Sequence, residues 1–237
     1  CIRDSCDMMT DETKTYEALL HLGIATDTQD MSGTVTAEAP VTVTEEEVRD
    51  CIASFVGEQQ QVPPMYSALK VNGKKLYELA REGIEIERKA RTVHFYEISI
   101  LEVKLPLVRM EVTCSKGTYI RTLLEDIAAA MGQKGTMSAL RRTTAGVYTE
   151  ADAHTLEEIQ AAKDAGPEAL QALMLPVESV FESLPLLVVE PWVEQHLYNG
   201  CPTSRYPAAD GRYRVRNAAG QFLGLADICL LYTSPSP

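Results

Sequence analysis

Strict alternation over residues 107–114 is the feature that most restricts what this chain can fold into. Apolar side chains stand at positions 108, 110, 112 and 114, and polar ones stand at 109, 111 and 113. Because successive side chains of a strand point to opposite faces, a period of two predicts a strand. Only one of its faces is apolar, so we expect a sheet with one buried face.

Other segments predict further strands and the helices that accompany them. Residues 16–22 place apolar side chains on one face of a second strand, and residues 93–102 and 137–146 predict two more. Thr44 is expected to cap a helix that Gly57 closes, and Thr118 to cap one that Gly132 closes. Another capping box opens a helix at residue 155, and residues 72–73 (Asn-Gly) predict a tight hairpin.

The order of these elements predicts an α+β fold, with a mixed, mainly antiparallel sheet and flanking helices. After residue 182 short strands surround one helix, which indicates a small β-rich C-terminal module over 182–228. Residues 1–13 and the Ser/Pro tail 229–237 lack periodicity, so we leave the first unassigned and expect a disordered or non-native tail in the second.

The net charge of −12 argues against a nucleic-acid binder when the chain is taken whole. The charge is unevenly distributed, however. Residues 66–142 hold 14 Lys and Arg against nine Asp and Glu, a net charge of +5. The rest of the chain holds eight against 25, a net charge of −17, so acidic flanks conceal a basic middle.

Six scattered Cys without a Cys-x-x-Cys pair argue against a zinc site or a disulfide scaffold, and favour a reducing, cytoplasmic environment. The four His have no ligand spacing, so we expect no metal. No apolar run reaches the roughly 20 residues of a membrane span, so we expect no membrane segment.

Four segments in this order resemble the TruB family of tRNA pseudouridine synthases. They are KTYEALLHLGIATDTQDMSG (14–33), VPPMYSALKVNGKKLYELAREGIEI (62–86), CSKGTYIRTLLEDIAAAMG (114–132) and ALRRTTAG (139–146). The resemblance implies a catalytic domain over 14–181 and a PUA-like module over 182–228. It also implies isomerisation of the T-loop uridine, conventionally position 55 of tRNA, by a monomer that needs neither cofactor nor protein partner.

In this family an Asp in a Gly-x-x-Asp-Pro segment attacks the nucleoside, after which the uracil is detached, turned and rejoined through carbon. No Asp-Pro dipeptide exists in this chain, and Asp4, Asp7 and Asp11 stand in the wrong context. The resemblance therefore predicts a synthase that lacks its N-terminal residues and nucleophile, and that is inactive as given.

Two residues match the family's remaining catalytic positions. Tyr16 would stack on the flipped uracil, since an aromatic face holds an extruded base; the alternative is a strand Tyr that fills the core. Arg141 would pair with the catalytic Asp through its planar guanidinium; the alternative is a solvated Arg on an edge strand. In a strand, Arg141 and Arg142 point to opposite faces.

Several basic and aromatic residues are expected to bind RNA, although each also fits a solvated surface. They are Lys70 and Lys74 beside the Asn-Gly hairpin, Lys116, Tyr119 and Arg121 at a helix start, and Arg142.

Two rival functions remain open. One is a non-catalytic tRNA-binding or tRNA-folding protein of the same fold. The other is a guide-RNA-dependent modifier of the dyskerin kind, whose usual basic extensions this sequence does not show.

Overall fold

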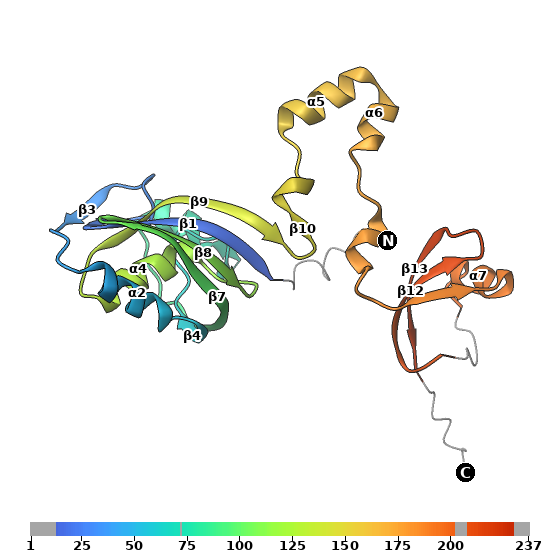
Figure 1. Cartoon of the computed structure of the whole chain (residues 1–237), viewed down its shortest axis with the longest axis horizontal. Helices are drawn as coiled ribbons and strands as arrows, with labels where there is room; N and C mark the ends of the chain where they lie inside the picture. The colour runs from blue at the N-terminus through green and yellow to red at the C-terminus, as the bar shows by residue number, and fades with distance from the viewer. Residues whose placement is uncertain (1–12, 72, 202–207, 230–237) are drawn as a thin grey trace, which may run out of the picture. The chain divides into compact units, whose positions relative to one another are not determined.

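The computed structural model describes residues 13–71, 73–201 and 208–229. The chain divides into two units, residues 1–153 and 154–237, each with its own internal contacts (Figure 1). Asp4, Asp7 and Asp11 lie outside the described residues, as do residues 1–12 and 230–237, so the predictions for both ends stay predictions. None of the described helices is long and apolar enough to cross a membrane.

A six-stranded antiparallel sheet forms the first unit, in the order β10-β9-β1-β8-β7-β4. The strands are β1 (Lys14–Leu22), β4 (Gly57–Gln61), β7 (Arg91–Lys104), β8 (Leu107–Cys114), β9 (Gly135–Ala145) and β10 (Tyr148–Thr149). The predicted alternation in β8 is confirmed, because the side chains at 108, 110, 112 and 114 are all buried. The expected antiparallel α+β architecture is therefore present.

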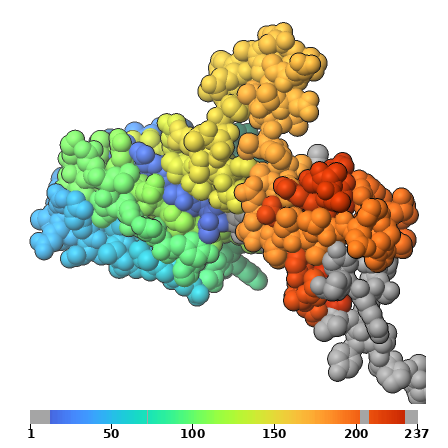
Figure 2. All heavy atoms as spheres, turned by 45° about the vertical axis from the view of Figure 1, so that its right-hand side comes forward, coloured from blue at the N-terminus to red at the C-terminus, as the bar shows by residue number. Residues whose placement is uncertain are grey.

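Helices α2 (Glu45–Ala53) and α4 (Ile120–Ala130) cover one face of this sheet (Figure 1). The core lies between these helices and the sheet. It consists mainly of Leu20, Leu22, Val48, Ile52, Val108, Met110, Val112, Leu123, Leu124 and Ile127. Neither α2 nor α4 covers the opposite face (Figure 1). Figure 2 shows atoms of β1 (blue) at the surface, between those of the neighbouring strands (green and yellow). The sheet is thus apolar on one face only, as the pattern in β8 requires.

Two predicted helix ends differ from the structure. The capping box of Thr44 and Glu47 is present, but α2 ends at Ala53, and Gly57 instead opens β4 with a φ of 106°. Thr118 is not the cap of α4. Its hydroxyl donates to the Ser115 carbonyl at 2.8 Å, and the extended Tyr119 is the cap residue instead.

Residues 62–90, here called the arm, connect β4 to β7. The arm contains the predicted hairpin, formed by β5 (Lys70–Val71) and β6 (Lys74–Lys75), and then helix α3 (Leu76–Arg81). Gly73 supplies the positive φ of 85° that the turn needs, while Asn72 lies outside the described residues. A second short hairpin, β2 (Ile24–Thr26) with β3 (Val35–Glu38), follows β1.

The second unit begins with two helices and continues into a small sheet that carries a third helix. The helices are α5 (Leu156–Ala165) and α6 (Pro167–Ala172); the sheet consists of β11 (Leu186–Val189), β12 (Gly211–Asn217) and β13 (Phe222–Ile228), with α7 (Pro191–Tyr198). The turn Val177–Phe181 belongs with this sheet, because the Phe181 ring stacks on Phe222 at 6.2 Å. The chain divides before His154, and the strands of the small sheet lie within the predicted module 182–228.

Candidate functional site

Tyr16 lies on the inner, helix-covered face of the sheet, near the start of β1. It is half-buried and packs against the main core. Its cross-strand partners are Val112 on β8 and Arg142 on β9. Directly opposed residues share a face, so Tyr16 and Arg142 point to the same side.

The inner face is open around Tyr16. Ala18 and Val112 are buried there, whereas Leu140 and Arg142 on β9 are exposed. Both β9 residues stand opposite β1 residues of the inner face, Leu140 beside Ala18 and Arg142 beside Tyr16. An aromatic ring, an apolar side chain and a cation are therefore accessible together, which is a combination suited to holding a base and its phosphate.

Arg141 lies on the face of the sheet opposite to Tyr16, and its predicted pairing with a catalytic Asp stays a prediction. Its cross-strand partner is Glu17, and its guanidinium forms an ion pair with Glu150. The side chain is 69% exposed, which fits the solvated alternative. The structure confirms that Arg141 and Arg142 point to opposite faces, but Arg142 is the one that shares a face with Tyr16.

Arg121, in the first turn of α4, has a guanidinium with three hydrogen-bond partners. It donates to the Asp30 carboxylate at 2.8 Å, the Thr28 carbonyl at 3.2 Å and the Tyr66 carbonyl at 2.8 Å. The Arg121 and Asp30 side chains are only 24% and 18% exposed. Arg121 therefore ties α4 to the loop after β2 and to the arm.

Asp30 is a site residue that the sequence analysis missed. Burial alone would raise its pKa, but hydrogen bonds from Ser32 and Thr28 and the charge of Arg121 together lower it. Asp30 is therefore ionised near neutral pH and keeps Arg121 in place. No spacing rule connects Asp30 with Arg121, since they are 91 residues apart.

The predicted RNA-binding lysines lie on the arm and before α4. Lys70 and Lys74 are exposed in the hairpin, and Lys74 lies 3.8 Å from Glu82, a loose surface ion pair. On the same arm the Tyr77 ring lies 5.4 Å from the Lys75 ammonium and 5.3 Å from the Arg81 guanidinium. Lys116 is exposed between β8 and α4. The arm thus presents a cluster of cations with an aromatic ring among them.

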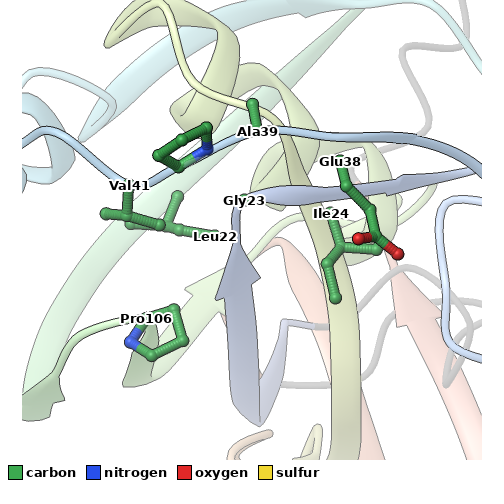
Figure 3. A pocket seen from close by; sticks show the side chains of 8 residues that line it. Leu22, Gly23, Ile24, Glu38, Ala39, Val41 and Pro106 are labelled. Atoms are coloured by element: carbon green, nitrogen blue, oxygen red, sulfur yellow. The ribbon is translucent and has the colours of Figure 1, made fainter.

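A hollow of about 450 Å³ lies at the other end of β1 and does not include these residues. Leu22, Val41 and Pro106 line it (Figure 3). A smaller pocket of about 200 Å³ is lined by Thr28 and Tyr66, two of the residues that hold Arg121. Among the described residues no group of three His, Cys, Asp or Glu side chains could bind a metal.

Comparison with known proteins gives matches over most of the chain. Residues 5–120 match the N-terminal domain of TruB family pseudouridylate synthases, and residues 121–182 match the tRNA pseudouridylate synthase B C-terminal domain. The first match begins at residue 5 and so includes residues that the sequence analysis left unassigned.

Relatives named tRNA pseudouridine synthase B come from several bacteria. The protein of Dechloromonas aromatica is 41% identical over 94% of this chain and 73% of its own length. Those of Alkaliphilus oremlandii and Ralstonia pickettii are 43% and 46% identical over 81% of this chain. The chain spans 62% and 61% of the length of these two relatives.

Solved structures share the fold at lower identity. A chain of a Cbf5-Nop10-Gar1 complex matches with a TM-score of 0.67 and 22% identity, over 94% of this chain and 62% of its own. An H/ACA ribonucleoprotein bound to a substrate RNA that contains 2′-deoxyuridine also matches at 0.67, with 20% identity over 94% of this chain and 61% of its own. Fold and sequence matches together define a pseudouridine synthase domain. The chain belongs to the TruB family of these isomerases.

Proposed function

We propose that this domain isomerises a uridine in the T-loop of tRNA, at the position conventionally numbered 55, to pseudouridine. The observation that carries the proposal is the open part of the inner face, where Tyr16, Leu140 and Arg142 are accessible together. Membership of the TruB family and relatives named tRNA pseudouridine synthase B support it.

The proposed chemistry needs the uridine outside its stack, because its reacting atoms are otherwise inaccessible. The Tyr16 ring then holds the extruded base by stacking, and Arg142 on the same face neutralises a phosphate. The arm and Lys116 bind the backbone of the stem. A carboxylate nucleophile completes the reaction, without metal or organic cofactor.

We propose that the chain as given does not supply this nucleophile. It contains no Asp-Pro dipeptide, and the family's nucleophile lies in a Gly-x-x-Asp-Pro segment. Release of tritium from uridine labelled at carbon 5 of a T-arm transcript tests the proposal. We expect no release by this chain, and release by a chimera with a relative's Gly-x-x-Asp-Pro segment ahead of Lys14. Release by the unmodified chain would contradict the missing nucleophile, and an inactive but folded chimera would contradict the proposed reaction.

The second candidate is a non-catalytic tRNA-binding or tRNA-folding protein, which the absence of an Asp-Pro dipeptide favours. A reading frame that continues upstream into a Gly-x-x-Asp-Pro segment supports the enzyme, and a start codon near residue 1 supports the binder. In either case we propose a cytoplasmic monomer without a required protein partner. Light scattering of the purified protein tests the monomer.

A further inference from the structure

Gln61 is a buried polar side chain that joins the base of the arm to the start of α4. It is the last residue of β4 and is 3% exposed. Its Nε2 donates to the Tyr119 carbonyl at 2.9 Å, and its Oε1 accepts from the Tyr119 backbone N–H at 2.8 Å. One side-chain amide therefore binds both backbone groups of one residue.

The two neighbouring glutamines of β4 have different roles. Gln60 is exposed and donates to the Thr92 hydroxyl at 2.8 Å, and Gln59 donates to the Phe55 carbonyl at 3.3 Å. The alternation of the strand directs Gln61 inward, where a polar group costs free energy unless it is hydrogen-bonded. Gln61 thus differs from the other two in both burial and partner.

The position of Tyr119 determines how α4 begins. Tyr119 is the cap residue of α4, with extended backbone angles of −108° and 107°, and its own side chain makes no capping hydrogen bond. Two bonds to a planar amide copy the paired bonds that join opposed residues of antiparallel strands. They therefore fix the peptide groups on both sides of Tyr119, and Arg121 follows two residues later.

A second hydrogen bond, donated by a residue of α4, also joins the base of the arm to this helix. Arg121 donates to the carbonyl of Tyr66, which lies five residues beyond Gln61. The bonds of Gln61 to Tyr119 and of Arg121 to Tyr66 thus form two adjacent connections between α4 and the base of the arm.

We propose that Gln61 is a positioning residue that acts through Tyr119 to keep the start of α4, its Arg121 tie and the base of the arm in the arrangement that binds the RNA. This inference rests on the proposed function, because it requires a T-arm as ligand. It predicts that removing the two Gln61 bonds weakens RNA binding without unfolding the sheet.

The test uses the full chain and a fluorescent T-arm stem–loop. Gln61→Ala removes both bonds, Gln61→Met removes them while keeping the buried volume, and Gln60→Ala is the matched control on the other face of β4. We expect both Gln61 variants to weaken binding about 10-fold, since small displacements of positioned groups have large effects, and the control to bind as the wild type does. Wild-type affinity in a folded Gln61→Met protein, or an equal loss in the control, would overturn the inference.

A double-mutant cycle with Arg121→Ala separates positioning from a general structural role. If Gln61 acts through Arg121, Gln61→Met changes the affinity of the Arg121→Ala protein less than about 2-fold. A further loss of affinity of about 10-fold when Gln61→Met is added to the Arg121→Ala protein would contradict the inference that Gln61 acts through Arg121.

Amide hydrogen exchange gives a readout that does not depend on RNA. Gln61→Met should accelerate exchange at Tyr119 and Arg121 but not in β9.

The exchange readout also separates the two proposals. If the wild type binds no T-arm RNA, the proposed function fails, and exchange still decides whether Gln61 fixes the start of α4. Unchanged exchange at Tyr119 in the Gln61→Met protein would overturn the positioning role by itself.

Discussion

At the scale of single residues, strand register decides which arginine shares a face with Tyr16. The sequence predicted that Arg141 and Arg142 point to opposite faces, and this is confirmed. It did not predict which of them shares a face with Tyr16, because that depends on the register of β9 against β1. The register shifts between Thr15 and Tyr16, and no local pattern announces such a shift.

Tyr16 is expected to contribute through its ring. Replacing it by Leu keeps an apolar side chain but removes the stacking surface, which is worth about 1–3 kcal/mol per base. We therefore expect Tyr16→Leu to weaken T-arm binding about 10-fold or more, whereas Tyr16→Phe binds nearly as the wild type does. Fluorescence anisotropy measures both, and equal affinities for all three proteins would rule out a stacking role.

The Asp30–Arg121 pair is expected to make stability depend on pH. Because the pKa of folded Asp30 lies below its usual 3.8, its contribution is fully present above that value and is lost as pH falls through the lowered pKa. Hydrogen bonds to charged groups are worth about 1.5–3 kcal/mol, and partial exposure reduces this to about 1 kcal/mol.

Urea unfolding at pH 7 and pH 3 measures this contribution. Asp30→Asn should cost about 1 kcal/mol at pH 7 and less at pH 3, which lies below the usual pKa of 3.8. The same cost at both pH values would show that the charge of Asp30 is not what stabilises the loop.

Arg121→Lys keeps the positive charge but loses the planar set of N–H donors, so it should weaken RNA binding.

At the scale of secondary-structure elements, the sequence predicted the features that depend only on neighbouring residues, such as capping boxes. The capping boxes of Thr44 with Glu47 and of Thr155 with Glu158 are both present, since each needs only four consecutive residues. The start of α4 was predicted one residue too early. The amide of Gln61, 58 residues away in the sequence, binds Tyr119 in its extended conformation, and such distant contacts leave no local pattern.

Removing the cap of α2 tests the strength of these local signals. Thr44→Ala leaves the backbone N–H of Glu47 without its side-chain acceptor and should cost about 1 kcal/mol of unfolding free energy. Thr44→Ser keeps the hydroxyl and should lie close to the wild type. Chemical denaturation measures both, and equal losses in the two variants would show that the hydroxyl is not the cause.

At the scale of the whole molecule, the sequence predicted the sheet-and-helix unit, and the structure adds that the second unit begins at His154. The sequence pattern changes to short strands after residue 182, and Glu178, just before this point, already contacts the small sheet. Its carboxylate accepts from Arg216 and Arg214, at 2.8 and 3.1 Å. Hydrogen bonds from Arg216 are the main reason that the pKa of Glu178 is lowered, against the opposing effect of burial.

Loss of the Glu178 charge should therefore destabilise the second unit. Glu178→Gln keeps the shape but leaves Arg214 and Arg216 without a carboxylate, and should lower the melting temperature of that unit by roughly 5 °C. Glu182→Gln is the comparison, because this exposed residue acts on Arg216 only through its charge and should matter less. Calorimetry measures both, and an unchanged melting temperature for Glu178→Gln would show that residue 178 is not part of the unit.

The uneven distribution of charge along the chain follows the elements of the fold. The basic segment 66–142 contains most of the arm, the start of α4 and Arg142, whereas the acidic residues lie mainly outside it. An RNA ligand is therefore expected to meet local positive charge despite a net charge of −12.

Equilibrium binding of a T-arm stem–loop tests the central claim most directly. Its affinity is compared with that of a hairpin of the same length and stem but with an unrelated loop, at two salt concentrations. The account predicts tighter binding of the T-arm at both concentrations and weaker binding of both RNAs at higher salt. Equal affinities for the two loops, or no binding of either, would contradict a site that selects a T-loop uridine.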